Sequence, residues 1–260
     1  MIDAIRTMAA EAGRLVMEHY GRVTATAKAD DSPLTAADLA SHAYLSRELV
    51  KLAPDCPVLS EESESISFAT RQAWRRFWLI DPLDGTKEFL KQSGEFTINI
   101  ALIEQGIPVL GLVFAPVLQR YYWAACGGQA FRANGDQSPV QIQAKAPDVN
   151  RLTIVASRDH AGPQVAELLG RFPTATTVSM GSSLKFCLVA EGAADIYLRD
   201  VPTMEWDTGA AQCVVEAAGG MVADLNGTRL SYNKPELRNP ALITLGDPHF
   251  PWRPGWPVQS

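Results

Sequence analysis

The sequence predicts a mixed α and β protein in two lobes, an α+β lobe over residues 1–140 and an α/β lobe over residues 141–260. Apolar residues recur at helical spacing in the first 52 residues, and β-type runs joined by turn residues follow from 95 to 125. After about residue 150, strand-like and helix-like segments alternate. With 260 residues, 47% of them hydrophobic, the chain can bury one sizeable core or two smaller ones.

The first lobe begins with two expected helices, whose ends carry the usual signals. Gly21 ends the first apolar stripe, and the second helix lies between Pro33 and Pro54. Gln105-Gly106 predicts a hairpin turn between two β-type runs, so we expect an antiparallel sheet. The expected helices span 3–20 and 34–52, and the expected strands span 57–60, 77–81, 96–103, 108–114 and 121–125.

The second lobe is expected to alternate between strands and helices, after a polar segment at 137–149. Its last helix ends at Gly219-Gly220, where glycine can adopt the left-handed conformation that closes many helices. The expected strands span 152–156, 175–179, 195–198 and 221–223, and the expected helices span 163–169, 182–190 and 206–218.

Charge and composition exclude several classes of function. The chain has 23 Lys and Arg against 29 Asp and Glu, a net charge of −6, which argues against a protein that coats nucleic acid polymers or membranes. A small anionic substrate still fits, provided that metal ions or a few local cations reverse the field in one cleft. We therefore expect a small-molecule partner and no nucleic acid.

The four cysteines and the N-terminal sequence indicate in which cellular compartment the protein is expected. Cys56, Cys126, Cys187 and Cys213 show no metal-binding spacing, so reduced and mostly buried thiols of a cytoplasmic protein are expected. Asp3 stands where a signal peptide would be basic, and no apolar run approaches the roughly 20 residues that span a bilayer. Peripheral contact with the cytoplasmic face of the inner membrane remains compatible with this pattern.

Two carboxylates follow an apolar run three residues apart, in the segment from Asp81 to Asp84. Pro82 fixes its own φ and Gly85 permits a sharp reversal, so that the carbonyl of Leu83 can also turn inward. Two carboxylates and a carbonyl form a hard oxygen set, suited to Mg²⁺ or Mn²⁺ rather than to zinc. A solvated Asp-Pro-x-Asp-Gly turn explains this pentapeptide equally well.

Two further acids stand at the ends of expected elements. Glu61 follows a strand, and Asp207 lies at the start of a helix. Each alone has an ordinary explanation, a solvated side chain for Glu61 and a complement to the helix dipole for Asp207. Together with Asp81, Asp84 and Thr86, they suggest a phosphatase with two or three metal ions, in which one ion lowers the pKa of an attacking water.

Three motifs together resemble the signatures of the inositol monophosphatase superfamily of Mg²⁺-dependent, lithium-sensitive phosphatases. They are Glu61-Glu62-Ser63, the segment from Asp81 to Thr86, and the segment from Trp206 to Ala211. Within that superfamily, the segment from Gly181 to Gly192 with Tyr197-Leu198-Arg199 is similar to the 3′(2′),5′-bisphosphate nucleotidase (CysQ-type) branch. The resemblance implies the layered αβαβα sandwich of the sugar-phosphatase type.

The resemblance also implies roles for single residues. Glu61, Asp81 and the carbonyl of Leu83 would hold one Mg²⁺, and Asp81, Asp84 and Asp207 would hold a second. Glu61 would bind a weaker third ion through water, and Mn²⁺ would substitute for Mg²⁺. The implied catalytic residues are Asp38, Glu61 and Thr86, of which Asp38 and Thr86 orient and help to deprotonate the attacking water.

The implied substrate contacts combine the metal site with a group of residues downstream. Lys185 and Arg199 would supply positive charge for a second phosphate. Without the resemblance, Lys185 is equally well explained as a solvated helix residue and His160 as a plain surface histidine. For Tyr197 and Trp206 the sequence allows two roles, stacking on a base of the substrate or packing in the core. The implied contacts are Glu61, Leu83, Asp84, Gly85, Thr86, His160, Ser182, Lys185, Arg199 and Asp207.

The resemblance to the bisphosphate nucleotidase branch implies a substrate, and other functions remain as alternatives. The leading hypothesis is hydrolysis of the 3′-phosphate of adenosine 3′,5′-bisphosphate to AMP and phosphate, which recycles a by-product of sulfate assimilation, with 3′-phosphoadenylyl sulfate as a second substrate. One rival is the same chemistry on inositol monophosphate or fructose 1,6-bisphosphate. Another is a non-catalytic sensor of a nucleotide or metal. Monomer and homodimer both remain open, as does a mobile lid at 63–75.

Overall fold

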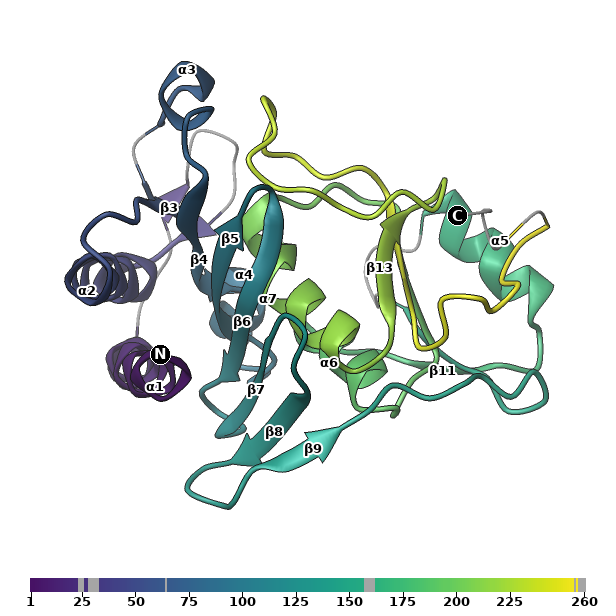
Figure 1. The fold of residues 1–260 in the computed structure, drawn as a ribbon. Coiled ribbons are helices and arrows are strands. Elements are labelled where there is room, and N and C mark those ends of the chain that lie inside the picture. The colour runs from purple at the N-terminus through teal and green to yellow at the C-terminus, as the bar shows by residue number, and fades with distance from the viewer. Residues whose placement is uncertain (23–25, 28–32, 64, 157–161, 255, 257–260) are drawn as a thin grey trace.

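The computed structural model describes residues 1–22, 26–27, 33–63, 65–156, 162–254 and 256. Figure 1 shows five layers, which confirm the expected αβαβα sandwich. Helices α1 (Ile2–His19) and α2 (Ala36–Leu52) cover one face of a seven-stranded sheet. Helices α6 (Leu184–Ala190) and α7 (Glu205–Ala217) lie between this sheet and a five-stranded sheet. Helix α5 (Pro163–Arg171) packs on the outer side of the second sheet.

The seven-stranded sheet has its strands in chain order, from β3 to β9. Only β3 and β4 pair in parallel, and the other neighbours are antiparallel, as the hairpin signals predict. The last two strands were not predicted, because β8 carries no β-branched residue and β9 is only three residues long. The strands are β3 (Val58–Ser60), β4 (Arg76–Asp84), β5 (Thr97–Glu104), β6 (Ile107–Ala115), β7 (Arg120–Ala125), β8 (Ala130–Asn134) and β9 (Val140–Ile142).

The five-stranded sheet is mixed, with the order β11-β10-β12-β14-β13. Strand β10 pairs in parallel with β11 and β12, as strand-helix alternation predicts, whereas β14 is antiparallel to both β12 and β13. Strand β14 was not predicted, because its four residues, Leu-Ile-Thr-Leu, are too few to show a period. The strands are β10 (Thr153–Val155), β11 (Thr176–Val178), β12 (Ile196–Arg199), β13 (Met221–Asp224) and β14 (Leu242–Leu245).

Short elements fill the connections of the first sheet. Strands β1 (Thr26–Ala27) and β2 (Pro33–Leu34) form a two-stranded ladder. Helix α3 (Phe68–Arg71) lies between β3 and β4, and α4 (Thr86–Leu90) directly follows β4. Helix α7 contacts strands of both large sheets, so the division into lobes near residue 140 stays a prediction.

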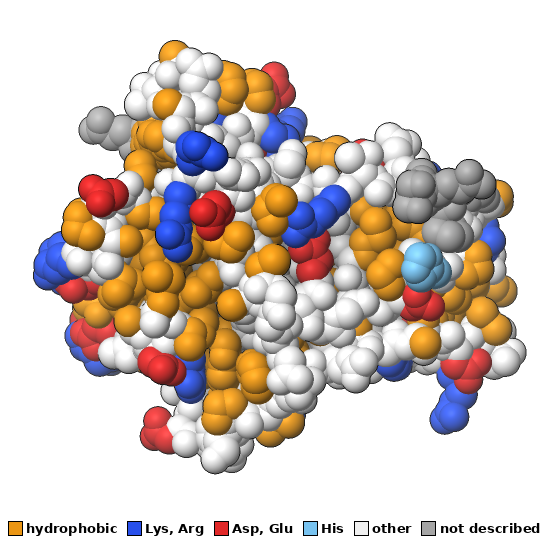
Figure 2. All heavy atoms as spheres, viewed as in Figure 1, with side chains coloured by type: hydrophobic (Ala, Val, Ile, Leu, Met, Phe, Trp, Pro, Cys, Tyr) orange, Lys and Arg blue, Asp and Glu red, His pale blue; other side chains and the backbone are white. Residues whose placement is uncertain are grey.

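The surface carries charges of both signs. On the face in Figure 2, Lys and Arg side chains lie singly or beside acidic ones, and hydrophobic side chains gather on the left half, over the seven-stranded sheet. Among the described residues drawn on this face, no large basic patch is visible. None of the described helices combines the length and the hydropathy that crossing a membrane requires.

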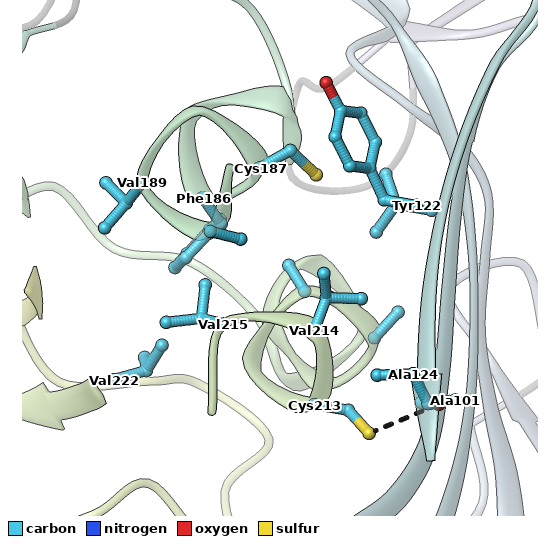
Figure 3. Close-up of a cluster of buried hydrophobic side chains, with 14 of the residues drawn as sticks. Ala101, Tyr122, Ala124, Phe186, Cys187, Val189, Cys213, Val214, Val215 and Val222 are labelled. Atoms are coloured by element: carbon cyan, nitrogen blue, oxygen red, sulfur yellow. Dashed lines mark hydrogen bonds between the residues drawn. The ribbon is translucent and has the colours of Figure 1, made fainter. Parts of the chain in front are cut away.

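The core between the sheets is built from the facing sides of α6 and α7. Figure 3 shows Val189 and Phe186 on one helix facing Val214 and Val215 on the other, with side chains of both sheets around them. Helix α7 approaches the first sheet at Gly111, where an added Cβ would lie 2.2 Å from the carbonyl oxygen of Ala210. This close approach packs the middle of α7 directly against β6, and α7 also contacts β4, the strand that carries Asp81 and Asp84.

The four cysteines are free, and three of them are buried, as the sequence predicts. Cys213 donates to the carbonyl of Ala124 at 3.6 Å, so its thiol behaves as a small packed side chain.

Candidate active site

A β-bulge in β4 sets the first two carboxylates. Asp81 pairs with Asn99 and Asp84 pairs with Thr97, so β4 has one more residue than β5 in this interval. Pro82 stands inside the bulge, where its missing amide breaks no ladder hydrogen bond. The sequence pattern placed the end of this strand at Asp81, but the strand continues through the bulge to Asp84. Both carboxylates are thereby fixed by the sheet, and not by a loose turn.

The chain turns sharply after the bulge. Gly85 has φ 94° and precedes α4, and an added Cβ there would lie 3.3 Å from the Cβ of Ser182 and 3.2 Å from Oε2 of Glu88. Glycine meets both the positive φ and the lack of space. Thr86 is the first residue of α4, and its hydroxyl lies 3.4 Å from the carbonyl oxygen of Leu83. The carbonyl predicted as a metal ligand thus faces the same side as Thr86.

Three acids from different elements come together. Glu61 follows β3, Asp81 lies in β4, and Asp207 is in the first turn of α7. One carboxylate oxygen of each lies within 4.8 Å of those of the other two. Oδ2 of Asp207 accepts the amide of Met204 at 2.8 Å, which fixes this carboxylate at the helix start.

Burial and repulsion between neighbouring carboxylates raise the pKa values of Asp81 and Asp207. Burial, followed by repulsion from Glu61 and Asp84, raises the pKa of Asp81 well above its usual value. Burial and then Asp84 raise the pKa of Asp207 to about 8. Buried like charges favour a bound cation, and the hard carboxylate oxygens fit Mg²⁺ or Mn²⁺. The residues present therefore suit the divalent cation that the sequence predicts.

Asp84 lies beside this acidic group but outside it. Its Oδ2 accepts the hydroxyl of Ser182 at 2.6 Å and the amide of Ser183 at 2.7 Å. Asp84 lines the same cavity as the three acids, and its role as a metal ligand stays a prediction.

The two residues that are predicted to activate the water, Asp38 and Thr86, are hydrogen-bonded to each other. Asp38, in the first turn of α2, is 1% exposed, and its Oδ2 accepts the amide of Thr35 at 2.8 Å and its hydroxyl at 2.6 Å. Its Oδ1 accepts the hydroxyl of Thr86 at 3.3 Å. The cap at the start of α2 thus fixes Oδ2 of Asp38, and Oδ1 accepts the hydrogen bond from Thr86.

A cavity of about 470 Å³ joins these residues to a basic side. Lys185 is 6% exposed, its Nζ donates to the carbonyl of Ser182 at 2.9 Å, and burial lowers its pKa to about 8. Asp38 is not among the lining residues, and His160 lies outside the described residues. The predicted residues that line the cavity are Glu61, Asp81, Leu83, Asp84, Gly85, Thr86, Ser182, Lys185, Arg199 and Asp207.

The aromatic candidates belong to the core. Tyr197 is buried and packs edge-on against Phe186, with ring centroids 4.9 Å apart, although it also lines the cavity. Trp206 packs against the core between the sheets. The sequence analysis missed Asn99 and Ser183, which both reach Asp84; a polar Asn inside the apolar run 96–103 was the available signal.

Comparisons with known proteins agree with this geometry. The model of the inositol monophosphatase family matches residues 1–246. The 3′(2′),5′-bisphosphate nucleotidase CysQ of Salmonella typhimurium is 46% identical over 239 residues, which are 91% of this chain and 95% of that protein. The protein of the same name from Escherichia coli K12 matches to the same extent, with 46% identity, 91% and 95%.

A solved structure supports the same assignment. The crystal structure of CysQ from Bacteroides thetaiotaomicron, a bacterial member of this family, superposes with a TM-score of 0.82 at 38% identity. The match covers 93% of this chain and 95% of that one. From its sequence, its layers and its acidic site, the chain belongs to the inositol monophosphatase family.

Proposed function

We propose that the chain is an Mg²⁺-dependent phosphatase that removes the 3′-phosphate of adenosine 3′,5′-bisphosphate, giving AMP and phosphate, and that also accepts 3′-phosphoadenylyl sulfate. Its likeness to CysQ proteins over nearly its whole length makes it an enzyme of the bisphosphate nucleotidase class. We place the reaction in the cytoplasm, where free cysteines such as these are the rule.

One observation carries the proposal: a single cavity has an acidic end and a basic side. The acidic end is formed by Glu61, Asp81 and Asp207, and the basic side by Lys185 and Arg199. A substrate with two phosphates satisfies both, since one phosphate is cleaved at the acidic end while the other pairs with the cations.

The acidic end would hold the cations. Two divalent ions, one held by Glu61, Asp81 and the Leu83 carbonyl and the other by Asp81, Asp84 and Asp207, would lower the pKa of the attacking water and offset the charge of the phosphate. Thr86 and Asp38 orient that water, because the Thr86 hydroxyl donates its proton to Asp38 and keeps its lone pairs available to accept one from water. The amides of Gly85 and Thr86 are proposed to donate to phosphate oxygens.

The second phosphate would lie against Lys185 and Arg199. The Lys185 ammonium is buried and bonded to a neutral carbonyl, so an anion is the partner that would compensate its charge best. Ser182 lines the same cavity, and its hydroxyl is bonded to Asp84 and Thr97, so its direct contact with the substrate stays a prediction.

A phosphate-release screen tests the proposal. Adenosine 3′,5′-bisphosphate, inositol 1-phosphate and fructose 1,6-bisphosphate are compared side by side, with Mg²⁺ and with a chelator. We expect the highest kcat/KM for the bisphosphate nucleotide and no turnover after chelation. A preference for inositol 1-phosphate would overturn the substrate assignment. Binding of the nucleotide without phosphate release under any condition would support a sensor.

A further inference from the structure

Ser183 connects two predicted metal ligands that lie far apart in the sequence. Its Oγ lies 2.7 Å from Oδ2 of Asp84 and 2.8 Å from the carbonyl oxygen of Asp207. The same Oγ accepts Nδ2 of Asn99 at 2.8 Å. Ser183 and Asn99 are each 1% exposed, so these bonds form without competing solvent.

From this arrangement we propose that Ser183 and Asn99 are positioning residues for the metal site. They hold the Asp84 carboxylate in one orientation and fix it relative to the start of α7, which carries Asp207. The inference rests on the proposed metal-dependent phosphatase and gives a role to two residues to which the resemblance assigns none.

The two oxygens of Asp84 have different roles in this arrangement. Oδ2 is surrounded by donors, whereas no hydrogen bond of Oδ1 occurs among the described residues. A carboxylate with one saturated oxygen cannot rotate without leaving buried donors unpaired, which is unfavourable for each donor. Oδ1 is therefore the oxygen presented to a cation. The donors to Oδ2 are the hydroxyls of Thr97, Ser182 and Ser183, the amide of Ser183 and the side-chain amide of Asn99.

The two positioning residues use all the hydrogens that their side chains can donate. The amide of Asn99 has two hydrogens, which serve Oδ2 of Asp84 at 3.2 Å and Oγ of Ser183 at 2.8 Å. Ser183 has a single hydroxyl hydrogen, shared between Asp84 and the carbonyl of Asp207. Losing either side chain leaves at least one of these buried groups short of a partner.

The backbone before Ser183 is shaped for this contact. Ser182 has φ 56°, a left-handed conformation that is uncommon for residues other than glycine. In this conformation the Ser182 hydroxyl and the Ser183 amide both reach Oδ2 of Asp84. Nζ of Lys185 donates to the Ser182 carbonyl at 2.9 Å and secures the turn. Strained residues of this kind persist where the surrounding contacts fix them, and they concentrate at functional sites.

The contacts join two structural layers. Asn99 in β5 and Asp84 at the end of β4 belong to the first sheet, and Ser183 lies directly before α6 of the middle layer. Thus the distance between Asp84 and the acidic group is set by side chains that do not themselves bind the cation. Such outer partners typically contribute 10-fold to 100-fold in metal affinity or activity.

The test measures metal affinity directly. Ser183→Ala, Asn99→Ala and the double variant are stripped with a chelator, and Mn²⁺ and Mg²⁺ binding is measured by titration calorimetry, alongside kcat, KM and the thermal midpoint. Thr244→Val is the matched control, since Thr244 is buried in β14 and its hydroxyl has no hydrogen-bond partner among the described residues. We expect each single variant to bind Mn²⁺ about 10-fold more weakly or worse, with the control unchanged.

The double variant separates a shared role from two independent ones. If both residues act on Asp84 through one arrangement, the double variant binds Mn²⁺ scarcely more weakly than either single variant. Metal affinity within twofold of the wild type, with only a lower thermal midpoint, would overturn the proposal, as would additive losses. If Ser183→Ala does not fold, Asn99→Ala decides, because it removes the same contact from the other side. Wild-type protein that binds no divalent cation would instead refute the proposed function.

Discussion

The hydroxyl of Thr86 donates to Oδ1 of Asp38 at 3.3 Å and so joins the start of α4 to the first turn of α2. The other oxygen of Asp38 is held by the backbone and side chain of Thr35, so the carboxylate cannot turn away. This leaves the threonine oxygen with lone pairs for a water in the cavity, which Thr86 lines.

Thr86→Val removes this hydroxyl and keeps the shape of the side chain. We expect kcat to fall by about 10²-fold to 10⁴-fold, the range for a lost general base, while KM and the thermal midpoint change little. Thr86→Ser keeps the hydroxyl and should retain most of the activity. Steady-state kinetics at saturating Mg²⁺ measure both variants; a Thr86→Val enzyme with nearly wild-type kcat would contradict the assigned role.

Asp207→Asn tests whether Asp207 holds an extra proton in the folded protein. Because the pKa of Asp207 is raised to about 8 in the folded, metal-free protein, the folded state holds this proton more tightly than the unfolded chain does. The stability that it contributes is complete below the ordinary carboxyl pKa of about 4 and is lost as the pH rises through about 8. In a chelator, the thermal midpoint of the wild type should therefore fall between about pH 4 and pH 8.

The variant should respond differently to pH and to metal. Without the ionisable group, Asp207→Asn should lose less stability over the same pH interval, and added Mg²⁺ should raise its thermal midpoint less than that of the wild type. Scanning calorimetry across the pH series checks both. An identical pH slope in the two proteins would mean that Asp207 does not hold the extra proton.

The sequence predicted the acids of the site because each stands at the end of an element whose pattern is visible. Asp81 follows an apolar run, and Asp207 opens a helix with a clear glycine stop. Pro82 inside a strand pattern was a usable sign of the bulge that carries the strand on to Asp84. These features depend on neighbours in the chain, which a single sequence displays.

The rest depends on residues that are distant in the chain. Ser183 and Asp84 are separated by 99 positions, and no periodicity connects them. Strand β14 was missed for a similar reason, since its place between β12 and β13 comes from pairing with both and not from its own four residues. Pairing across the fold, rather than local propensity, decides both cases.

Arg71 anchors the segment that follows Glu61, which bears on the open question of a lid at 63–75. This side chain is 2% exposed and donates to the carbonyls of Lys234 at 2.7 Å and Pro235 at 2.8 Å, and to Oδ1 of Asn233 at 3.0 Å. Arg71→Ala leaves these acceptors unpaired, so we expect a loss on the order of 3 kcal/mol in the free energy of unfolding. Chemical denaturation measures it.

Proteolysis separates local loosening from global loss. If Arg71 anchors this segment, Arg71→Ala should be cut between 63 and 75 faster than the wild type under native conditions, whereas Arg71→Lys should show an intermediate rate. Equal cleavage of all three proteins would mean that the segment is held by other contacts.

Lys185→Met tests the basic side of the cavity while preserving the packing of the side chain. Because burial lowers the pKa of Lys185 to about 8, its charge is progressively lost above that pH. We expect the wild-type KM for adenosine 3′,5′-bisphosphate to rise between about pH 7.5 and pH 9.5, and the variant to show about a 10-fold higher KM at pH 7 that varies little with pH. A simple monophosphate, lacking the second phosphate, should be affected much less. Equal effects on both substrates would show that Lys185 does not touch the second phosphate.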